Sequence, residues 1–407
     1  MPLAELRARQ LRKLNELLAA TLPQNTFYAE KLSSLALPLA SLDQLGAVAP
    51  TQKDELVTDF AAANHTYPLD QYVRFHRTSG TRGRPMVVMD TAADWKWWID
   101  AWQFVLDVAE IEPADRVFMA FSFGPFIGFW SAHDAVCARG ATAIPGGGMS
   151  TLARLELIES SRATSVCCTP TYALHMAETA REHGIQLDQN RVRSLIVAGE
   201  PGGSIPSTRE RIEAAWGAAV VDHSGATEVG PWGYADRAGT GLYVNESEFY
   251  PEFVALDSGA PANSGELAEL VITTLGRSGC PVIRYRTGDL VRPAWRPESA
   301  NHFVFLPGGV LGRVDDMMII RGVNVFPSSV EQILRGFDEI REYRLTAHKD
   351  GEMDALSVEI EDAADNAPRV ADELQLRLGL KIQVTCVPPG SLPRFEAKGR
   401  RFVDQRP

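Results

Sequence analysis

Short apolar runs alternate with amphipathic stretches through the middle of the chain. The apolar runs predict buried strands at Val117–Phe121, Ser165–Cys168, Leu195–Ala198 and Ala218–Val221. The amphipathic stretches predict helices at Thr151–Arg162, Tyr172–His183 and Ser207–Trp216, two of them opened by the start signals Ser150 and Pro206. Strands and helices in alternation predict a parallel sheet with helices packed on it, and therefore an α/β fold.

The pattern changes twice in the second half of the chain. Between Gly241 and Leu306, short strands separated by Gly and Pro turns predict a β-rich subdomain. Beyond Gly312 the predicted elements are a helix at Ser328–Arg335, strands near Tyr343 and Leu356, a helix at Val370–Leu378 and a strand at Ile382–Val387. They predict an α+β unit of about 90 residues, near the lower end of domain size. We therefore expect a large N-terminal domain, residues 1–311, and a small C-terminal domain, residues 312–407.

The bulk composition limits the partners and the compartment. A net charge of −12 argues against a nucleic-acid partner, because nucleic-acid binding depends on a basic footprint. The chain has no run that approaches the roughly 18 uninterrupted apolar residues of a membrane span, and its arginine-containing start lacks a signal-peptide core. Five cysteines, an odd number without metal-type spacing, favour a reducing cytoplasm.

The segment Arg77–Pro85 is a glycine-rich loop that carries three hydroxyls and three arginines. Glycines let the backbone approach phosphate oxygens closely, and hydroxyls and peptide N–H groups supply hydrogen-bond donors. The spacing is not that of a Walker A loop. The candidate phosphate-binding residues are Thr78, Ser79, Gly80, Thr81 and Gly83. The alternative is a polar surface turn between two strands.

Two polar segments follow predicted buried strands, Gly199–Pro201 and Asp222–Glu228. Residues at the carboxyl end of a parallel strand face the ligand crevice. Glu228 is a candidate Mg²⁺ ligand because hard cations take carboxylate oxygens. As an alternative, Thr227 with Glu228 fits an ordinary helix N-terminus, and a Gly-Glu-Pro triplet is by itself a common turn.

Tryptophans predict part of the core. Trp95, Trp98 and Trp102 fall at i, i+3 and i+7, on one face of a predicted helix. Further along, Phe121–Trp130 leaves a predicted strand and enters a helix. Apolar side chains of this kind line small-molecule pockets, although ordinary core packing explains Phe129 and Trp130 equally well.

The stretch Gly312–Glu331 contains a glycine, paired acids, a short apolar run and a second glycine turn. It resembles the hinge of the acyl-adenylate-forming ligases, the AMP-dependent synthetase/ligase superfamily of acyl-CoA synthetases, luciferases and peptide-synthetase adenylation domains. Other motifs of that family occur in the same order at Arg77–Pro85, Ala198–Pro201, Val221–Glu228, Arg284–Asp289 and Leu392–Arg400. Phe27–Leu32 and Pro50–Leu56 are similar to the phenylacetate–CoA ligase branch.

The resemblance implies a role for each candidate residue. It assigns the ATP phosphates to Thr78, Ser79, Gly80, Thr81 and Gly83. It assigns the adenine to Gly199, Glu200, Pro201, Asp222, His223, Ser224, Gly225 and Ala226. Thr227 and Glu228 fall at catalytic positions, with Glu228 as the Mg²⁺ ligand, and Asp289 and Arg313 fall at the ribose, whose hydroxyls a carboxylate can accept. A plain strand followed by a Gly-Asp turn is the alternative at Asp289. Phe121 and Phe126 match aromatic positions of the acid pocket.

The remaining implied roles concern the small domain. Lys398 matches the catalytic lysine, a flexible point charge that would offset repulsion between the acid's carboxylate and the α-phosphate of ATP. The alternative for Lys398 is a solvated basic tail. The small domain would swing about Asp315 and bring Arg321 and Gly322 to the coenzyme A tunnel, where glycine lets the backbone approach the pantetheine arm.

The chain departs from the family pattern at a few positions. Arg82 stands where Thr is usual, Arg84 where Lys is usual and Ala397 where Gly is usual. Some phenylacetate–CoA ligase relatives carry a zinc-binding cysteine cluster after the ribose motif. The segment Val291–Leu311 has no cysteine, so we expect no zinc.

The implied reaction has two half-reactions. ATP, with Mg²⁺, and a carboxylic acid give an acyl-adenylate and pyrophosphate, and coenzyme A (CoA) then displaces AMP to give a thioester. The phenylalanines suggest an aromatic or arylacetic acid. A homodimer is compatible with the sequence. Transfer to an amine or a carrier-protein thiol is the nearest alternative, and a catalytically silent nucleotide-binding protein is another.

Overall fold

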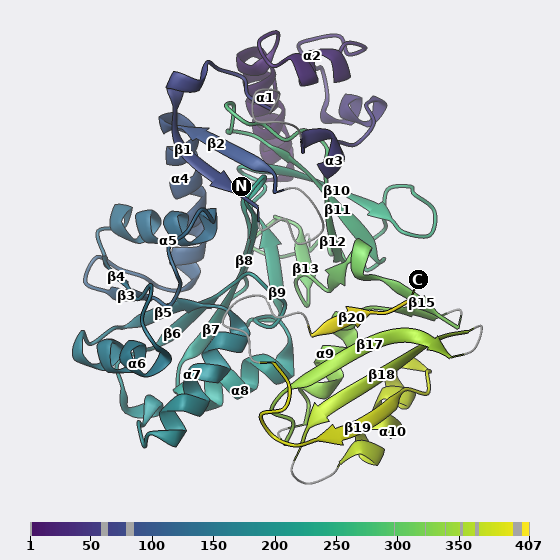
Figure 1. Cartoon of the computed structure of the whole chain (residues 1–407). Helices are drawn as coiled ribbons and strands as arrows, with labels where there is room; N and C mark the ends of the chain where they lie inside the picture. The colour runs from purple at the N-terminus through teal and green to yellow at the C-terminus, as the bar shows by residue number, and fades with distance from the viewer. Residues whose placement is uncertain are drawn as a thin grey trace.

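A single mixed sheet organises the larger part of the molecule (Figure 1). The computed structural model describes residues 2–57, 64–78, 85–296, 298–321, 323–337, 339–350, 353–362, 366–393 and 401–406, with main chain only at 315, 319 and 324. The eight-stranded sheet has the order β13-β9-β8-β7-β6-β5-β3-β4. Its parallel strands are β3 (Arg116–Met119), β4 (Thr142–Pro145), β5 (Ser165–Cys168), β6 (Ser194–Val197) and β7 (Ala219–Ala226). Its antiparallel strands are β8 (Gly230–Ala235), β9 (Gly241–Val244) and β13 (Phe305–Pro307).

Helices cover both faces of this sheet, and the parallel strands β3, β5, β6 and β7 bury side chains on each side. On β3, for example, Val117 and Met119 belong to one apolar cluster and Phe118 to the other. The first cluster receives α4 (Ala92–Val108) and α5 (Ile127–Ala138). The second receives α6 (Thr151–Ser160), α7 (Pro170–Glu182) and α8 (Pro206–Trp216). The predicted α/β fold class, with its helices between the strands, is confirmed.

The N-terminal region and the β-rich subdomain pack together. A four-stranded antiparallel sheet contains β10 (Phe249–Ala255), β11 (Ala268–Thr274), β12 (Tyr285–Val291) and β14 (Gly312–Arg313). The helices α1 (Leu3–Thr21), α2 (Thr26–Lys31) and α3 (Lys53–Leu56) precede the hairpin of β1 (Tyr72–Arg77) and β2 (Val87–Thr91). The predicted β-rich segment is therefore divided, since β9 and β13 join the large sheet instead of this one.

The C-terminal part has its own sheet and apolar core. A hairpin of β15 (Met318–Ile320) and β16 (Val323–Val325) leads into α9 (Pro327–Leu334). The sheet has the order β19-β18-β17-β20, from β17 (Tyr343–Asp350), β18 (Met353–Glu361), β19 (Gln383–Val387) and β20 (Phe402–Asp404), with α10 (Ala367–Leu378) beside β19. Its core runs from Met318 to Ile382, with Phe402 packed against it. The predicted small α+β unit is confirmed as a fold.

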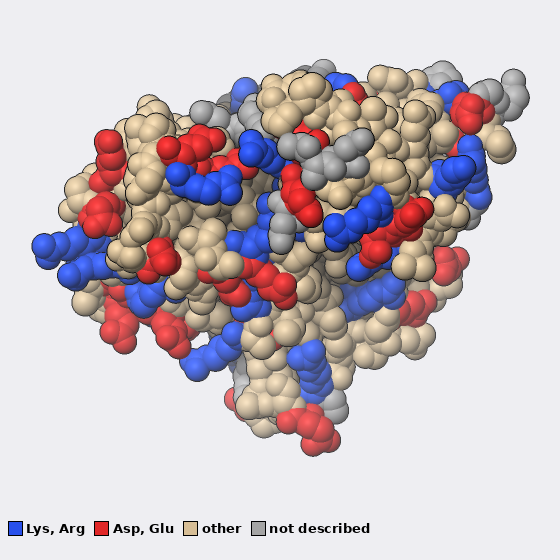
Figure 2. Space-filling view, turned by 90° about the horizontal axis from the view of Figure 1, so that it is seen from below, with Lys and Arg blue, Asp and Glu red and all other residues tan. Residues whose placement is uncertain are grey.

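The surface carries charges of both signs. On the face seen in Figure 2, lysines and arginines are interspersed with aspartates and glutamates. Within the described ranges, no helix is long and apolar enough to cross a membrane. The tryptophan face predicted for the core is confirmed, because Trp95, Trp98 and Trp102 of α4 are all buried.

Candidate active site

Glu228 lies in the turn that joins β7 to β8. The sequence pattern predicts a strand end at Val221, but β7 continues to Ala226 with an irregular register near its end. Gly225 suits this irregularity, because a Cβ there would lie 2.9 Å from the carbonyl oxygen of Gly230. The chain then reverses into β8. The alternative that Thr227 begins a helix is therefore wrong: Thr227 and Glu228 occupy a hairpin turn.

The carboxylate of Glu228 is buried between two donors. Its Oε1 atom accepts a hydrogen bond from Tyr285 Oη at 2.7 Å and pairs with Lys53 Nζ at 3.2 Å. Burial raises the pKa of Glu228, but the Lys53 charge and the Tyr285 hydrogen bond outweigh that effect and the pKa is lowered. Burial raises the pKa of Tyr285 far above its ordinary value, so its hydroxyl remains a donor. Glu228 is therefore a carboxylate at neutral pH.

Sequence reasoning did not find Lys53. It belongs to α3, inside the segment Pro50–Leu56. The similarity of this segment to the phenylacetate–CoA ligase branch can be read from the sequence, but the pairing of Lys53 with Glu228 cannot. Thr51 fixes this segment against β12, because its N–H donates to Arg284 O at 2.7 Å and its carbonyl accepts from Arg286 N at 3.0 Å. A contact between residues so distant in sequence, Lys53 and Glu228, leaves no local pattern.

The residues present fit a magnesium ion bound together with ATP. Among the described residues, no group of three or more His, Cys, Asp or Glu side chains could hold a metal by itself. Mg²⁺ does not require such a cage, because it usually keeps several waters and takes one or two carboxylates plus substrate phosphates. The buried, ionised Glu228 can supply that carboxylate.

Asp289 and Arg313 are brought together as neighbours across two strands. Asp289 on β12 is the register partner of Arg313 on β14. The Arg313 Nη1 atom donates to Asp289 Oδ1 at 2.6 Å. Because Tyr285 begins the same strand and contacts Glu228, the predicted ribose and metal motifs meet through β12.

The predicted phosphate loop is described only at its first residue. Thr78 closes the base of the β1–β2 hairpin: its N–H donates to Met86 O, and its Oγ1 accepts from Met86 N, both at 3.0 Å. The other loop positions, Ser79, Gly80, Thr81, Arg82, Gly83 and Arg84, lie outside the described residues. The same holds for Gly322, Ala397, Lys398 and the side chain of Asp315.

The turn after β6 is shaped for close approach. Gly199 has φ +93°, a conformation that favours glycine. Glu200 accepts hydrogen bonds from the N–H and the hydroxyl of Thr171, at 2.8 and 2.5 Å, near the start of α7. Pro201 follows and is half-buried. A carboxylate at a helix N-terminus is electrostatically favourable, so Glu200 fixes this turn to α7.

The residues predicted around the adenine divide into two groups. Asp222 is buried, accepts a hydrogen bond from Ser204, and has its pKa raised to about 6 by burial. His223 is buried, bonds to Gly233 O at 2.8 Å and packs on Trp102. By contrast, Ser224 and Ala226 are half-buried and Gly225 is exposed.

Aromatic rings cluster after β3. Phe121 stacks on Phe129 with ring centroids 4.5 Å apart, and Phe126 meets Phe129 edge to face at 6.4 Å. Phe126 is 40% exposed, so this side chain is available to a bound molecule. The structure therefore adds Phe129 to the predicted pair, and its ring is shared between them.

The segment predicted to be the hinge follows β14 directly. Asp315 lies in a short 3₁₀ turn, η5 (Val314–Asp316). Arg321 follows β15 with φ +50°, and its exposed guanidinium lies 3.5 Å from Asp350. The main chain thus changes direction at both positions.

Comparison with known proteins agrees with this geometry. The family model of AMP-binding enzymes matches residues 21–250, and that of the AMP-binding enzyme C-terminal domain matches residues 322–406. The phenylacetate–coenzyme A ligase of Escherichia coli is 32% identical, covering 99% of this chain and 95% of the relative. That of Thermus thermophilus is 29% identical, covering 100% of this chain and 98% of the relative.

Solved structures show the same likeness. A 2-hydroxyisobutyryl-CoA ligase in its postadenylation state, in complex with 2-HIB-AMP, superimposes with a TM-score of 0.92 at 26% identity, covering 100% of this chain and 90% of that one. The same enzyme with CoA in its thioesterification state gives 0.74 at 28% identity, covering 100% and 91%.

These matches define an adenylate-forming enzyme, and the chain belongs to the AMP-binding enzyme family. Within it, the chain is a phenylacetate–CoA ligase-like, AMP-forming acid–CoA ligase. The predicted superfamily, branch and reaction class are confirmed.

Proposed function

We propose that this ligase activates an aromatic or arylacetic acid as its adenylate and transfers the acyl group to CoA. The observation that carries the proposal is the contact between Glu228 and Tyr285, which joins the metal motif to the ribose motif of β12. A site for Mg²⁺-ATP needs these two motifs side by side. The names of the relatives, which include phenylacetate–CoA ligases, support the aromatic class of acid.

Each half of the nucleotide has its own residues in this proposal. Asp289 accepts hydrogen bonds from the ribose hydroxyls, and Arg313 holds the Asp289 carboxylate in place. Glu228 would hold Mg²⁺, which would supply positive charge to offset the negative charge of the ATP phosphates. Thr78, with the glycine-rich loop after it, receives the phosphates. Lys398 contacts the reacting oxygens.

The adenine residues act in two ways. We assign the contact with the base to the main chain of Gly199–Pro201 and of Ser224–Ala226, where the chain is partly exposed. Asp222 and His223 have internal partners, so their side chains position these segments instead. Thr227 completes the turn that carries Glu228.

The acid binds against the phenylalanine cluster. Phe121 and Phe126 line the pocket in this proposal, with Phe129 between them. Aromatic rings prefer offset-stacked or edge-to-face contacts with other rings. An aryl group on the acid can therefore make contacts that an alkyl chain of the same length cannot.

The two half-reactions divide between two arrangements of the domains. We place the domain boundary at 311/312 and the pivot at Asp315. The higher similarity to the postadenylation structure than to the thioesterification structure supports an arrangement here that suits the first half-reaction. In the second, Arg321 and Gly322 would face the pantetheine arm.

The remaining assignments follow from composition and family. We propose a cytoplasmic enzyme with no membrane or nucleic-acid partner, consistent with its net charge of −12 and with the interspersed charges of Figure 2. Its composition is compatible with a homodimer.

The test is AMP release from Mg²⁺-ATP across matched aryl and alkyl acids, with and without CoA. We expect release with arylacetic acids, faster with CoA, and a thioester product. Equal turnover of alkyl acids would contradict the aromatic pocket. Pyrophosphate release that CoA does not accelerate would contradict CoA as acceptor and favour an amine or a carrier-protein thiol.

A further inference from the structure

Arg277 is a fully buried arginine behind the active-site turn. It follows β11, and its side chain has no exposure to solvent. Its Nε donates to Asp90 Oδ1 at 2.7 Å, and Asp90 is equally buried. Trp98 of α4 packs against it, with the guanidinium carbon 5.3 Å from the ring centroid.

The same guanidinium holds the main chain of the Glu228 turn. Arg277 Nη1 donates to the carbonyl oxygens of Thr227 at 3.1 Å and Glu228 at 2.9 Å. Two consecutive carbonyls bound to one nitrogen restrict rotation of the peptide between them. The orientation of that peptide determines where the Glu228 side chain begins.

Both ends of this linkage are anchored. Asp90 belongs to β2, the second strand of the hairpin whose base Thr78 closes. On the other side, Asp94 accepts from the N–H groups of Ser278 at 2.8 Å and Gly279 at 3.2 Å, so the loop that carries Arg277 is fixed to α4. Arg277 therefore links the Thr227–Glu228 turn to the β1–β2 hairpin.

Stability alone does not account for this pair. A buried ion pair is often no more stabilising than well-packed apolar residues of similar volume. Within the described residues, Arg277 Nη2 and Asp90 Oδ2 are buried without a hydrogen-bond partner. An incompletely satisfied pair is less favourable still. The feature that an apolar replacement could not reproduce is the hold on the Thr227 and Glu228 carbonyls.

We propose that Arg277 is a positioning residue of the adenylation half-reaction. Through its bonds to Thr227 O, Glu228 O and Asp90, it fixes the Glu228 carboxylate relative to the β1–β2 hairpin, whose base Thr78 closes. The proposal rests on the proposed role of Glu228 as the Mg²⁺ ligand. It predicts that Arg277 affects divalent-ion and ATP binding but has no part in thioester formation.

The test compares Arg277→Lys with three other variants. Lysine keeps the positive charge beside Asp90 but has one ammonium in place of the planar fork. Arg277→Gln with Asp90→Asn removes both charges together and guards against misfolding from a lone buried charge. Arg139→Lys is the matched control, because Arg139 also contacts a carboxylate, Asp107, and two carbonyls, those of Gln103 and Ile111. Glu228→Gln tests the ligand itself.

Two readouts separate positioning from folding. The first is equilibrium Mn²⁺ binding, followed by electron paramagnetic resonance with a non-hydrolysable ATP analogue. The second is the rate of thioester formation from preformed acyl-adenylate and CoA. We expect Mn²⁺ affinity to fall about 10-fold or more in Arg277→Lys, the range for residues that orient a metal ligand. The double variant should show the same loss, with thioester formation unchanged in both, and Arg139→Lys should match the parent enzyme.

Contrary outcomes are distinct. Unchanged Mn²⁺ affinity in Arg277→Lys, with a loss in Glu228→Gln, would overturn the positioning role alone. Unchanged affinity in both would overturn the role of Glu228 and the proposal with it. Equal loss of both half-reactions in Arg277→Lys and in the double variant would show a structural role only.

Discussion

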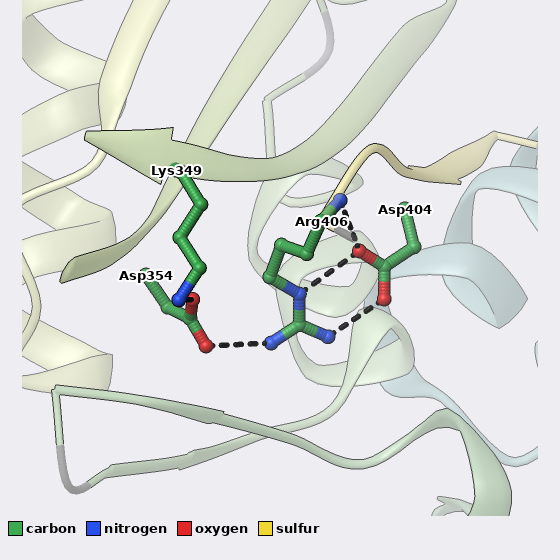
Figure 3. Close-up of a pocket in the computed structure, with 4 residues that line it drawn as sticks. All are labelled: Lys349, Asp354, Asp404 and Arg406. Carbon is green, nitrogen blue, oxygen red and sulfur yellow. Dashed lines mark hydrogen bonds and ion pairs between the residues drawn. The ribbon is translucent and has the colours of Figure 1, made fainter. Parts of the chain in front are cut away.

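Arg277 and Arg406 each hold carboxylates, but in opposite surroundings. Arg277 is fully buried in the large domain and contacts Asp90 and two main-chain carbonyls. Arg406 lies beside β20 and bridges Asp404 to Asp354, which also pairs with Lys349 at 2.8 Å (Figure 3). These four side chains line a shallow hollow at the surface.

The difference shows what burial adds to the same chemical group. Between charges, attraction is several-fold stronger in a protein interior than in water, and buried pairs are screened less by salt. Arg277 also restrains backbone, whereas the side-chain bonds of Arg406 go to carboxylates and hold the end of the chain against the β17–β18 hairpin. We therefore expect function to depend on the first cluster and only local order on the second.

Removing Arg277 should have the largest effect on stability. Arg277→Ala leaves the Asp90 carboxylate buried without its cation, which destabilises proteins by about 3–5 kcal/mol. Urea unfolding of the parent and the variant measures this difference. The double change Arg277→Met with Asp90→Leu should recover much of the stability but not adenylation, and full recovery of adenylation would contradict the importance of the turn contacts.

The loss of a positive charge near Glu228 should alter the pH dependence of catalysis. The lowered pKa keeps Glu228 ionised down to low pH. The contribution of the ionised carboxylate to catalysis is lost as the pH falls through the folded-state pKa of Glu228. Lys53→Met removes the largest factor that lowers the pKa, so the acid limb of ATP–pyrophosphate exchange should move to higher pH.

Lys31→Met is the matched control for this change. Lys31 pairs with Glu55 at 2.8 Å, in a segment next to Lys53 but without contact to Glu228. The pH profile of ATP–pyrophosphate exchange in Lys31→Met should match that of the parent enzyme. An unmoved acid limb in Lys53→Met would show that Glu228 does not control it.

Asp222 should make a smaller, pH-dependent contribution to stability. Burial raises its folded-state pKa to about 6 from 3.8, so the folded protein binds a proton that the unfolded chain lacks between these values. Relative to Asp222→Asn, the parent should therefore gain stability as pH falls from 7 to 4. The gain is about 1.4 kcal/mol for each pH unit that separates the folded-state pKa from the unfolded-state pKa.

Asp115 provides a control of opposite sign. Burial tends to raise the pKa of Asp115, but the hydrogen bonds from Arg193, the main chain of Glu112 and Thr164 outweigh it and the pKa is lowered. Relative to Asp115→Asn, the parent should change little in stability between pH 7 and 4 and should lose stability as the pH falls below the unfolded-state pKa of 3.8. Chemical unfolding at several pH values measures both, and slopes of the same sign would contradict these assignments.

The smallest effect should come from Arg406→Gln. Exposed ion pairs contribute little and are screened by salt. We expect adenylation to be unchanged and the thermal midpoint to move slightly at low salt and less at high salt. A large loss of activity would contradict the comparison between the two clusters.

Local pattern predicted much of the fold and the linear motifs. The apolar runs predicted four of the five parallel strands, β3, β5, β6 and β7, because both faces of those strands are buried. The edge strand β4 was not predicted, since none of its residues is fully buried. The strand β7 exceeded its apolar run, since Asp222 and His223 find polar partners inside the protein and a sequence pattern does not show such partners. The spacing of the tryptophans predicted the buried face of α4, because residues at helical spacing share one face of a helix.

Contacts between distant segments could not be predicted. Asp289 and Arg313 were both named as ribose candidates because of the family resemblance, and the register of β12 and β14 makes them neighbours, while their contact with the ribose stays a prediction. Lys53 and Arg277 were missed. Each lies in an ordinary polar segment, and its contact with the Glu228 turn arises only when distant parts of the chain come together in the fold.

The central claim is that an acyl-adenylate forms first and that CoA consumes it. The most direct measurement is a single turnover with excess enzyme, Mg²⁺-ATP and phenylacetate, quenched and analysed by mass spectrometry before and after CoA is added. We predict phenylacetyl-adenylate and pyrophosphate without CoA, then conversion to the thioester and AMP. Formation of ADP and phosphate, or of thioester with no adenylate before it, would contradict the account.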